Sequence, residues 1–133
     1  MNKKPKKKER PVVLVADDES DARSTVIDFL KERYECVFKE AKDGEEAISF
    51  IKNNPCDIVI LDIKMPKQSG MRVLDEIKAF NSEIDVLIIS AWASDNLEEE
   101  AAESGATDFA AKPLDLKTLA LKFANILDMR GQK

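Results

Sequence analysis

The sequence predicts an α/β domain built on a parallel β-sheet with helices on both faces. Five short apolar segments alternate along the chain with five amphipathic segments, and the connections between them are short. Repeated strand–helix units of this kind build a parallel sheet covered by helices. The 133 residues fit one domain, because single cores divide only at roughly 250 residues and above.

The first half of the chain contains three expected strands and two expected helices. Residues 11–16 and 57–61 are almost continuously apolar, as expected of strands buried on both faces. Residues 35–41 mix apolar and charged side chains and predict a weaker strand. Residues 19–34 and 44–53 carry apolar side chains at helical spacing. The side chains expected to face the core are Ala22, Val26, Phe29, Leu30, Ala47, Ile48 and Ile51.

The second half continues the same alternation. Residues 84–89 predict a fourth apolar strand and residues 107–111 a short fifth one. Helices are expected at 69–80, 95–104 and 115–129. The helix at 95–104 has a thin apolar face and four glutamates, which indicates loose packing. The side chains expected to face the core are Val73, Leu74, Ile77, Leu97, Ala101, Leu116, Leu119, Ala120, Phe123 and Leu127.

The composition excludes several classes of protein. Histidine is absent, which excludes Ser-His-Asp and Cys-His catalysis and every His-ligated metal site, and means that the chain cannot be its own phosphohistidine donor. Two cysteines, Cys36 and Cys56, are too few for a disulfide scaffold, and we expect reduced thiols in a cytoplasmic protein. No apolar run approaches the roughly 20 residues of a membrane helix, and residues 12–16 are too short for the core of a signal peptide.

Charge is distributed unevenly along the chain. The net charge is −5, but residues 1–10 hold six Lys/Arg and one Glu, so +5 lies in this segment and −10 in the remainder. An acidic body disfavours direct binding of nucleic acid. We expect residues 1–10 to be a disordered basic tail, able to meet a polyanion, a membrane surface or an acidic partner. Residues 11–129 are expected to form the domain and 130–133 a C-terminal tail.

Polar residues follow four of the expected strands. Asp17 and Asp18 follow the first strand, Asp62 the third, Ser90 the fourth and Lys112 the fifth. The carboxyl ends of parallel strands share one edge of the sheet, and ligands bind there, near the point where strand order reverses. One aspartate after a strand is often only a helix cap. Five polar residues at the same edge predict a functional site.

These residue types favour phosphoryl chemistry with a metal ion. Adjacent carboxylates repel each other and raise each other's pKa unless a cation lies among them. Oxygen ligands of this kind suit Mg²⁺ or Mn²⁺. A carboxylate beside such a metal can act as a nucleophile and become an acyl phosphate. Lys112 could then neutralise the phosphoryl oxygens, and the Ser90 hydroxyl could donate a hydrogen bond to them.

At about residues 11–128 the sequence resembles the receiver domain of two-component response regulators. The matching motifs are Val15-Ala-Asp-Asp-Glu19, Leu61-Asp-Ile-Lys-Met-Pro66 followed by Gly70, Ile89-Ser-Ala91 and Phe109-Ala-Ala-Lys-Pro113. The resemblance implies a flavodoxin-like (βα)5 doubly wound sheet with strand order 2-1-3-4-5. That order places strand 1 between the two cysteines, at a separation of roughly two strand spacings, or about 9.6 Å, which is beyond disulfide reach.

The resemblance also implies a role for each site residue. Asp62 is the implied phosphoacceptor. The implied ligands of Mg²⁺, for which Mn²⁺ could substitute, are Asp17, Asp18, Asp62 and the backbone carbonyl of Lys64. Ser90 and Phe109 are the implied switch pair: Ser90 moves to bond the phosphoryl group, and Phe109 turns into the space that Ser90 leaves. Lys112 pairs with the phosphoryl group.

Three further positions complete the expected site. The bond between Lys112 and Pro113 is commonly cis in this family, and it shapes the loop that carries the lysine. The side chains of Lys64 and Trp92 are expected beside the phosphoryl group. We hypothesise that Trp92 shields the acyl phosphate from water and slows its hydrolysis. Ser90 stands where the family often has Thr and Phe109 where it often has Tyr, and neither departure removes the chemistry.

The implied function is a signalling switch and not an enzyme, beyond catalysis of its own phosphorylation and dephosphorylation. The donor would be a histidine kinase or a His-containing phosphotransfer protein, and the output face would comprise helix 4, strand 5 and helix 5. No nucleic-acid contact or membrane insertion is expected, and the domain would be a monomer or a phosphorylation-dependent dimer. It would be a single-domain regulator or a phosphorelay intermediate; alternatively, it is a receiver excised from a larger hybrid kinase or output-domain regulator.

Two rivals use related folds. A haloacid-dehalogenase-like phosphatase also has a strand-end aspartate and Mg²⁺, but it needs an acid two residues later, where this chain has Lys64. A flavodoxin needs a hydroxyl- and glycine-rich phosphate loop after strand 1. The acidic run from Asp17 to Glu19 would repel a phosphate there.

Overall fold

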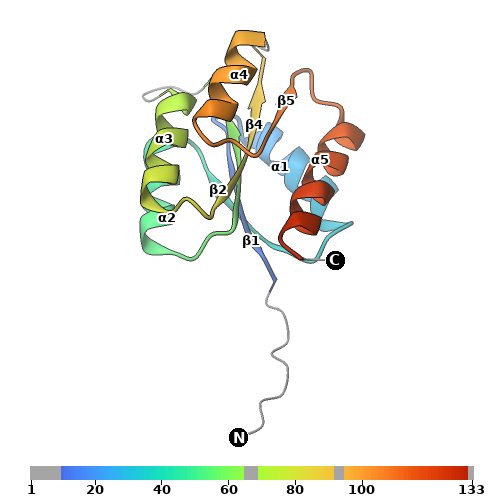
Figure 1. Cartoon of the computed structure of the whole chain (residues 1–133). Coiled ribbons are helices and arrows are strands. Elements are labelled where there is room, and N and C mark those ends of the chain that lie inside the picture. Colours follow the sequence, from blue (N-terminus) through green and yellow to red (C-terminus); the bar gives the residue numbers. More distant parts are fainter. Residues whose placement is uncertain (1–9, 65–68, 92–94, 132–133) are drawn as a thin grey trace, which may run out of the picture.

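The computed structural model describes residues 10–64, 69–91 and 95–131, with the backbone alone for Asp95. One five-stranded parallel sheet has the order β2-β1-β3-β4-β5, which confirms the flavodoxin-like α/β fold (Figure 1). The strands are β1 (Val12–Ala16), β2 (Val37–Ala41), β3 (Ile58–Asp62), β4 (Asp85–Ser90) and β5 (Asp108–Ala111). The helices are α1 (Ser20–Lys31), α2 (Gly44–Asn53), α3 (Gly70–Phe80), α4 (Asp95–Glu103) and α5 (Leu116–Met129).

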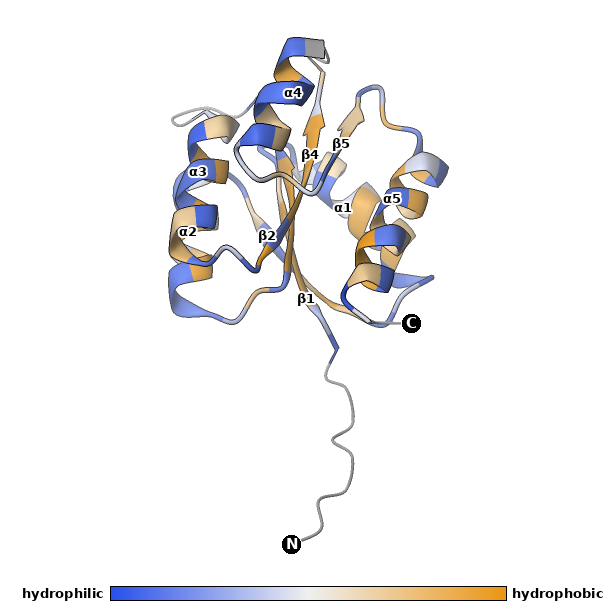
Figure 2. Cartoon of the chain, viewed as in Figure 1, coloured by the Kyte–Doolittle hydropathy of each residue, from blue (hydrophilic) through white to orange (hydrophobic). Residues whose placement is uncertain are grey.

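The molecule has three layers, with α2, α3 and α4 on one face of the sheet and α1 and α5 on the other (Figure 1). Alternate residues of each strand enter opposite cores. Leu14 of β1 packs toward α2 and α3, whereas Val13 and Val15 pack toward α1 and α5. The ribbon is mostly hydrophobic along the central strands, whereas hydrophobic and hydrophilic residues alternate along the helices (Figure 2). The two-sided burial explains why the central strands β1, β3 and β4 are almost continuously apolar. The edge strand β2 is mixed, and its Lys39 and Glu40 are exposed.

The strand register brings the carboxyl ends of the central strands to one edge. Ala16 of β1 pairs with Leu61 of β3, Asp62 pairs with Ile89 of β4, and Ser90 pairs with Ala111 of β5. The residues at or just after these positions therefore share one edge of the sheet, as the sequence predicts.

The first helix is shorter than its sequence pattern predicts. It ends at Lys31, and the backbone amides of Arg33 and Tyr34 both donate to the Leu30 carbonyl in the turn that follows. The Tyr34 ring meets Phe123 of α5 edge-on, with 5.3 Å between ring centroids, and its hydroxyl donates to the Ala120 carbonyl. Packing against α5 thus replaces continuation of the helix.

A close backbone contact fixes the start of α3. The amide of Gly70 donates to the Ile63 carbonyl over 2.9 Å. A Cβ atom at residue 70 would lie 2.4 Å from the Ile63 Cα atom, so only glycine fits without a backbone shift. The segment directly after Asp62 is thereby held against α3.

Arg130 holds the opposite edge of the sheet together. It lies one residue beyond the expected end of the domain, and its guanidinium binds Asp57 at 3.0 Å and Asp85 at 2.8 Å. The other Asp57 oxygen accepts from the Val12 amide, and the Thr107 hydroxyl donates to Asp85. One side chain after α5 therefore links the N-terminal ends of β1, β3 and β4 to the turn before β5.

The two cysteines are free and half-buried, as the strand order implies. Burial, with a smaller contribution from the Asp57 charge, raises the pKa of Cys36 and of Cys56 to about 11. Both thiols are therefore poor nucleophiles at neutral pH. Among the described residues, no helix combines the length and apolar content that crossing a bilayer requires.

Candidate functional site

The turn after β1 carries two carboxylates. The amide of Asp17 donates to the Ala41 carbonyl of β2 over 3.1 Å, and its Oδ1 accepts from the Glu19 amide over 2.9 Å. The Asp17 side chain is buried, whereas Asp18 is exposed. The buried carboxylate is therefore fixed by the turn, and its neighbour faces solvent at the same edge.

Asp62 ends β3 and is contacted through both of its oxygens. It is only 4% exposed. Its Oδ1 accepts from the Lys64 amide over 3.1 Å, and its Oδ2 binds the Lys112 ammonium over 3.0 Å. The same ammonium lies 3.6 Å from Oδ2 of Asp17. Lys112 thus bridges the carboxylates of β1 and β3 from the loop after β5.

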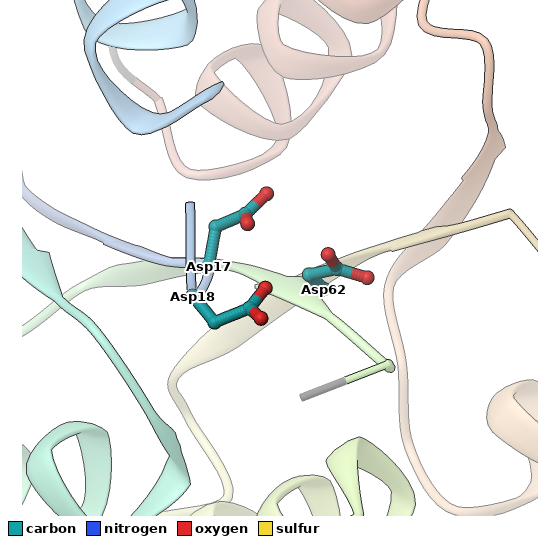
Figure 3. A group of neighbouring side chains, drawn as sticks. All are labelled: Asp17, Asp18 and Asp62. Carbon is teal, nitrogen blue, oxygen red and sulfur yellow. The ribbon is translucent and has the colours of Figure 1, made fainter. Parts of the chain in front are cut away.

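The three aspartates form a compact cluster (Figure 3). One carboxylate oxygen from each of Asp17, Asp18 and Asp62 lies within 4.8 Å of the other two. Three carboxylates and one ammonium leave two negative charges uncompensated. The donor set is all oxygen, which is the type that Mg²⁺ prefers. Both the charge and the chemistry of the cluster therefore fit a divalent cation.

The pKa shifts of Asp17 and Lys112 agree with a site that fits a divalent cation. Burial is the main cause that raises the pKa of Asp17, and the Asp62 charge adds to it, although the bond from the Glu19 amide acts the other way. Burial alone would lower the pKa of Lys112, but its hydrogen bond to Asp62 and the charges of Asp62 and Asp17 outweigh it and raise the pKa. The ammonium therefore remains charged at neutral pH, while the metal-free cluster disfavours the charged form of Asp17.

The two expected switch residues lie on neighbouring strands. Ser90 is the last residue of β4 and is fully buried, and its carbonyl accepts from the Lys112 amide over 2.9 Å. Phe109 lies in β5 and is 8% exposed. It borders a groove of about 400 Å³ between α4 and α5 and a smaller cavity of about 120 Å³ beside α4. Open space therefore lies next to Phe109.

Three expected positions remain: Lys64, the bond between Lys112 and Pro113, and Trp92. Lys64 is exposed, two residues after Asp62. The peptide bond between Lys112 and Pro113 is cis. Trp92 lies outside the described residues. The structure thus brings Asp17, Asp18, Asp62 and Lys112 into direct proximity, and their roles remain predictions.

Sequence reasoning missed Arg23, which joins the turn after β1 to β2. Its Nη1 donates to the Asp17 carbonyl and its Nε binds Glu40, each over 2.7 Å. Its spacing from Val26 and Leu30, three and seven residues later, places Arg23 on the inward-facing side of the helix and was the available signal. Neither of its partners could be identified from the periodicity of one helix.

Comparison with known proteins identifies the class. The family described as "Response regulator receiver domain" matches residues 13–124. The chain belongs to this family and is a signalling domain of two-component systems. The family assignment leaves the phosphatase and flavodoxin alternatives without support.

Individual relatives agree with this assignment. The transcriptional regulatory protein ZraR of Klebsiella oxytoca is 35% identical over 115 residues, which cover 86% of this chain and 26% of ZraR. The chain thus spans about a quarter of that relative.

Two solved structures are similar throughout the domain. The signal receiver domain of a putative Luxo repressor protein from Vibrio parahaemolyticus has a TM-score of 0.86 and 30% identity, covering 91% of this chain and 92% of that one. A CheX-CheY-BeF3-Mg²⁺ complex from Borrelia burgdorferi has a TM-score of 0.83 and 32% identity, covering 88% of this chain and 89% of that one.

Proposed function

We propose that this chain accepts a phosphoryl group on Asp62 from the phosphohistidine of a histidine kinase or a His-containing phosphotransfer protein. The observation that supports this most directly is the position of Asp62. It is a buried carboxylate at a strand end, bonded to an ammonium 3.0 Å away and clustered with two further carboxylates. The Borrelia complex, which contains a beryllium fluoride and Mg²⁺, supports the same reading.

The chain's own residues would act as follows. An Asp62 oxygen attacks phosphorus, and the new O–P bond forms as the N–P bond of the donor breaks. The donor ring, already protonated at its other nitrogen, leaves as neutral imidazole. Asp17, Asp18, Asp62 and the Lys64 carbonyl would hold Mg²⁺, which neutralises charge on the transferring group. Lys112 would exchange its bond to Asp62 for one to a phosphoryl oxygen, and the Ser90 hydroxyl would donate to another.

The test is the intact mass of the protein after incubation with acetyl phosphate. Wild type, Asp62→Ala and Asp75→Ala are compared with Mg²⁺ and with a chelator. Asp75 is an exposed aspartate of α3 and serves as the matched control. We expect one phosphoryl group on wild type and Asp75→Ala with Mg²⁺, and none on Asp62→Ala or with chelator. An adduct on Asp62→Ala would contradict the proposal.

We further propose that α4, β5 and α5 form the output surface. Phe109 is one of the residues that line the groove between α4 and α5. Only Ala101 of the described α4 side chains is fully buried, so α4 can shift at low cost. Glu98 at the groove and the exposed Glu99, Glu100 and Glu103 favour a partner with basic side chains.

Hydrogen exchange tests the output surface. We expect phosphorylation to change exchange in α4 and β5 and to leave α2, which lies away from them, unchanged. Identical exchange of residues 95–111 with and without the phosphoryl group would contradict this part of the proposal.

A further inference from the structure

Arg23 makes two short contacts beside the candidate metal site. It lies in the second turn of α1 with its side chain only 14% exposed. Its Nη1 donates to the Asp17 carbonyl, and its Nε binds Oε1 of Glu40 on β2. One guanidinium therefore connects helix α1, the turn that carries two carboxylates and the neighbouring strand.

That turn has few other restraints. Glu19, the residue before α1, forms no side-chain cap of the helix. The Asp17 amide donates to the Ala41 carbonyl, the Glu19 amide donates to the Asp17 carboxylate, and the Lys112 ammonium lies 3.6 Å from Oδ2 of Asp17. None of these contacts holds the Asp17 carbonyl. Arg23 provides the bond to the main-chain oxygen between Asp17 and Asp18. Loss of this bond frees the peptide unit that sets the positions of both carboxylates.

Mg²⁺ is sensitive to such a change. It demands near-ideal octahedral geometry at short distances of about 2.0–2.1 Å, so misplaced ligands weaken it sharply. Groups that orient metal ligands without touching the metal typically contribute about 10- to 100-fold in affinity.

We propose that Arg23 is a positioning residue for the metal site, which holds the peptide unit between Asp17 and Asp18 for cation binding. This inference rests on the proposed function, since it concerns the same Mg²⁺ site. Arg23 touches the main chain and Glu40, and neither of its contacts is with the three carboxylates of the cluster.

The charge of Arg23 makes the test decisive, because positioning and electrostatics predict opposite results. If Arg23 acted only as a nearby cation, Arg23→Gln would remove a repulsion and tighten Mg²⁺ binding. If Arg23 positions the turn, the same variant weakens binding. Arg23→Lys keeps the charge but cannot reproduce a planar, two-pronged contact, so it also weakens binding if positioning dominates.

The experiment measures the Mg²⁺ dissociation constant by titration calorimetry on the whole chain. We expect an increase of roughly tenfold for Arg23→Gln and a smaller increase for Arg23→Lys. The matched control is Arg33→Gln, which removes the same charge and a similar bond, from Nη1 to the Phe29 carbonyl, beyond the far end of α1. Wild-type or tighter affinity in Arg23→Gln, or an equal loss in Arg33→Gln, would overturn the inference.

Two further measurements separate positioning from loss of folding. In the metal-free protein, the amides of Asp17 and Glu19 should exchange several-fold faster in Arg23→Gln, whereas amides in the centre of β3 should not change. Glu40→Ala should weaken Mg²⁺ binding more in wild type than in Arg23→Gln, because Glu40 acts partly through Arg23. Additive losses would contradict this linkage.

Failure of the inference is distinguishable from failure of the proposed function. If wild type binds Mg²⁺ and accepts a phosphoryl group while Arg23→Gln binds Mg²⁺ equally well, only the role of Arg23 is wrong. If wild type itself binds no Mg²⁺, the proposed site is wrong, and the role of Arg23 toward it is wrong as well.

Discussion

At the scale of single residues, Lys112 and Asp62 form the most informative pair. Lys112 lies 3.0 Å from one Asp62 oxygen and 3.6 Å from an Asp17 oxygen. It therefore occupies a negative cluster to which a divalent cation would also be attracted. Before phosphorylation, the Lys112 ammonium and the metal ion would repel each other, because both are attracted to the same carboxylates. After phosphorylation, both would stabilise the phosphoryl oxygens.

Lys112→Ala should bind Mg²⁺ more tightly than wild type. Removal of a cation a few ångströms away favours binding by roughly threefold to tenfold, reduced by solvent because the side chain is 26% exposed. The metal-free variant should also be less stable, because the carboxylates lose their counter-ion. Calorimetric titration and chemical unfolding measure the two effects. Lys117→Ala, at an exposed position of α5, is the control, and weaker Mg²⁺ binding in Lys112→Ala would contradict the prediction.

The two half-buried thiols predict that stability depends on pH. The pKa of Cys36 and of Cys56 is raised to about 11 in the folded protein, against 9.0 for an exposed thiol. The unfolded chain therefore loses protons first, and the contribution present below about pH 9 is lost as pH rises through about 11. Urea unfolding between pH 8 and 11 should show this loss, and a Cys36→Ser/Cys56→Ser variant should show less of it.

Five candidate site residues could be predicted from the sequence pattern because each lies at or just after the end of an apolar strand: Asp17, Asp18, Asp62, Ser90 and Lys112. The roles expected of Lys64, Phe109 and Trp92 came from the family resemblance. The sequence could not show that Lys112 bridges two carboxylates or that Arg23 reaches the Asp17 carbonyl. Those contacts depend on the lengths and directions of side chains from α1 and from the loop after β5, which hydrophobic periodicity does not record.

At the scale of elements, the start of α3 controls the backbone beside the site. Gly70→Ala should destabilise the domain by roughly 1–3 kcal/mol, because the new Cβ would meet the Ile63 Cα atom at 2.4 Å. Ser69→Ala, which removes the helix cap on the Arg72 amide, is the comparison and should cost about 1 kcal/mol. Chemical unfolding measures both. Equal stability of Gly70→Ala and wild type would contradict this prediction, because it would mean that the backbone after β3 moves to accept the new Cβ atom without a loss of stability.

The order and type of all ten elements could be predicted from sequence, with boundaries within a few residues. The largest deviation was the end of α1, where Tyr34 packs against Phe123 and does not extend the helix. A contact between residues so far apart in the chain leaves no mark on local periodicity. The close approach at Gly70 was likewise invisible, since the sequence shows a glycine but not the Ile63 backbone opposite it.

At the scale of the whole molecule, Arg130 should contribute strongly to stability. Arg130→Gln should lower the free energy of unfolding by roughly 1–3 kcal/mol, because Asp57 and Asp85 lose charged hydrogen bonds. Lys31→Gln removes an exposed pair with Asp28 and should cost well under about 1 kcal/mol. Thermal or chemical unfolding compares the two variants. Equal losses would show that the Arg130 links are no stronger than an ordinary surface pair.

Arg130 binds at the N-terminal ends of the strands, whereas the candidate phosphorylation site lies at their carboxyl ends. The length of the sheet therefore separates the Arg130 charge from that site. Asp57 directly precedes β3 and Asp62 is its last residue, and five residues of strand span roughly 17 Å, about twice the distance over which physiological salt screens exposed charges. Durability and signalling are thus separately adjustable. A protein engineer could raise or lower the stability of the domain through Arg130 and its partners while leaving the response to a phosphodonor unchanged.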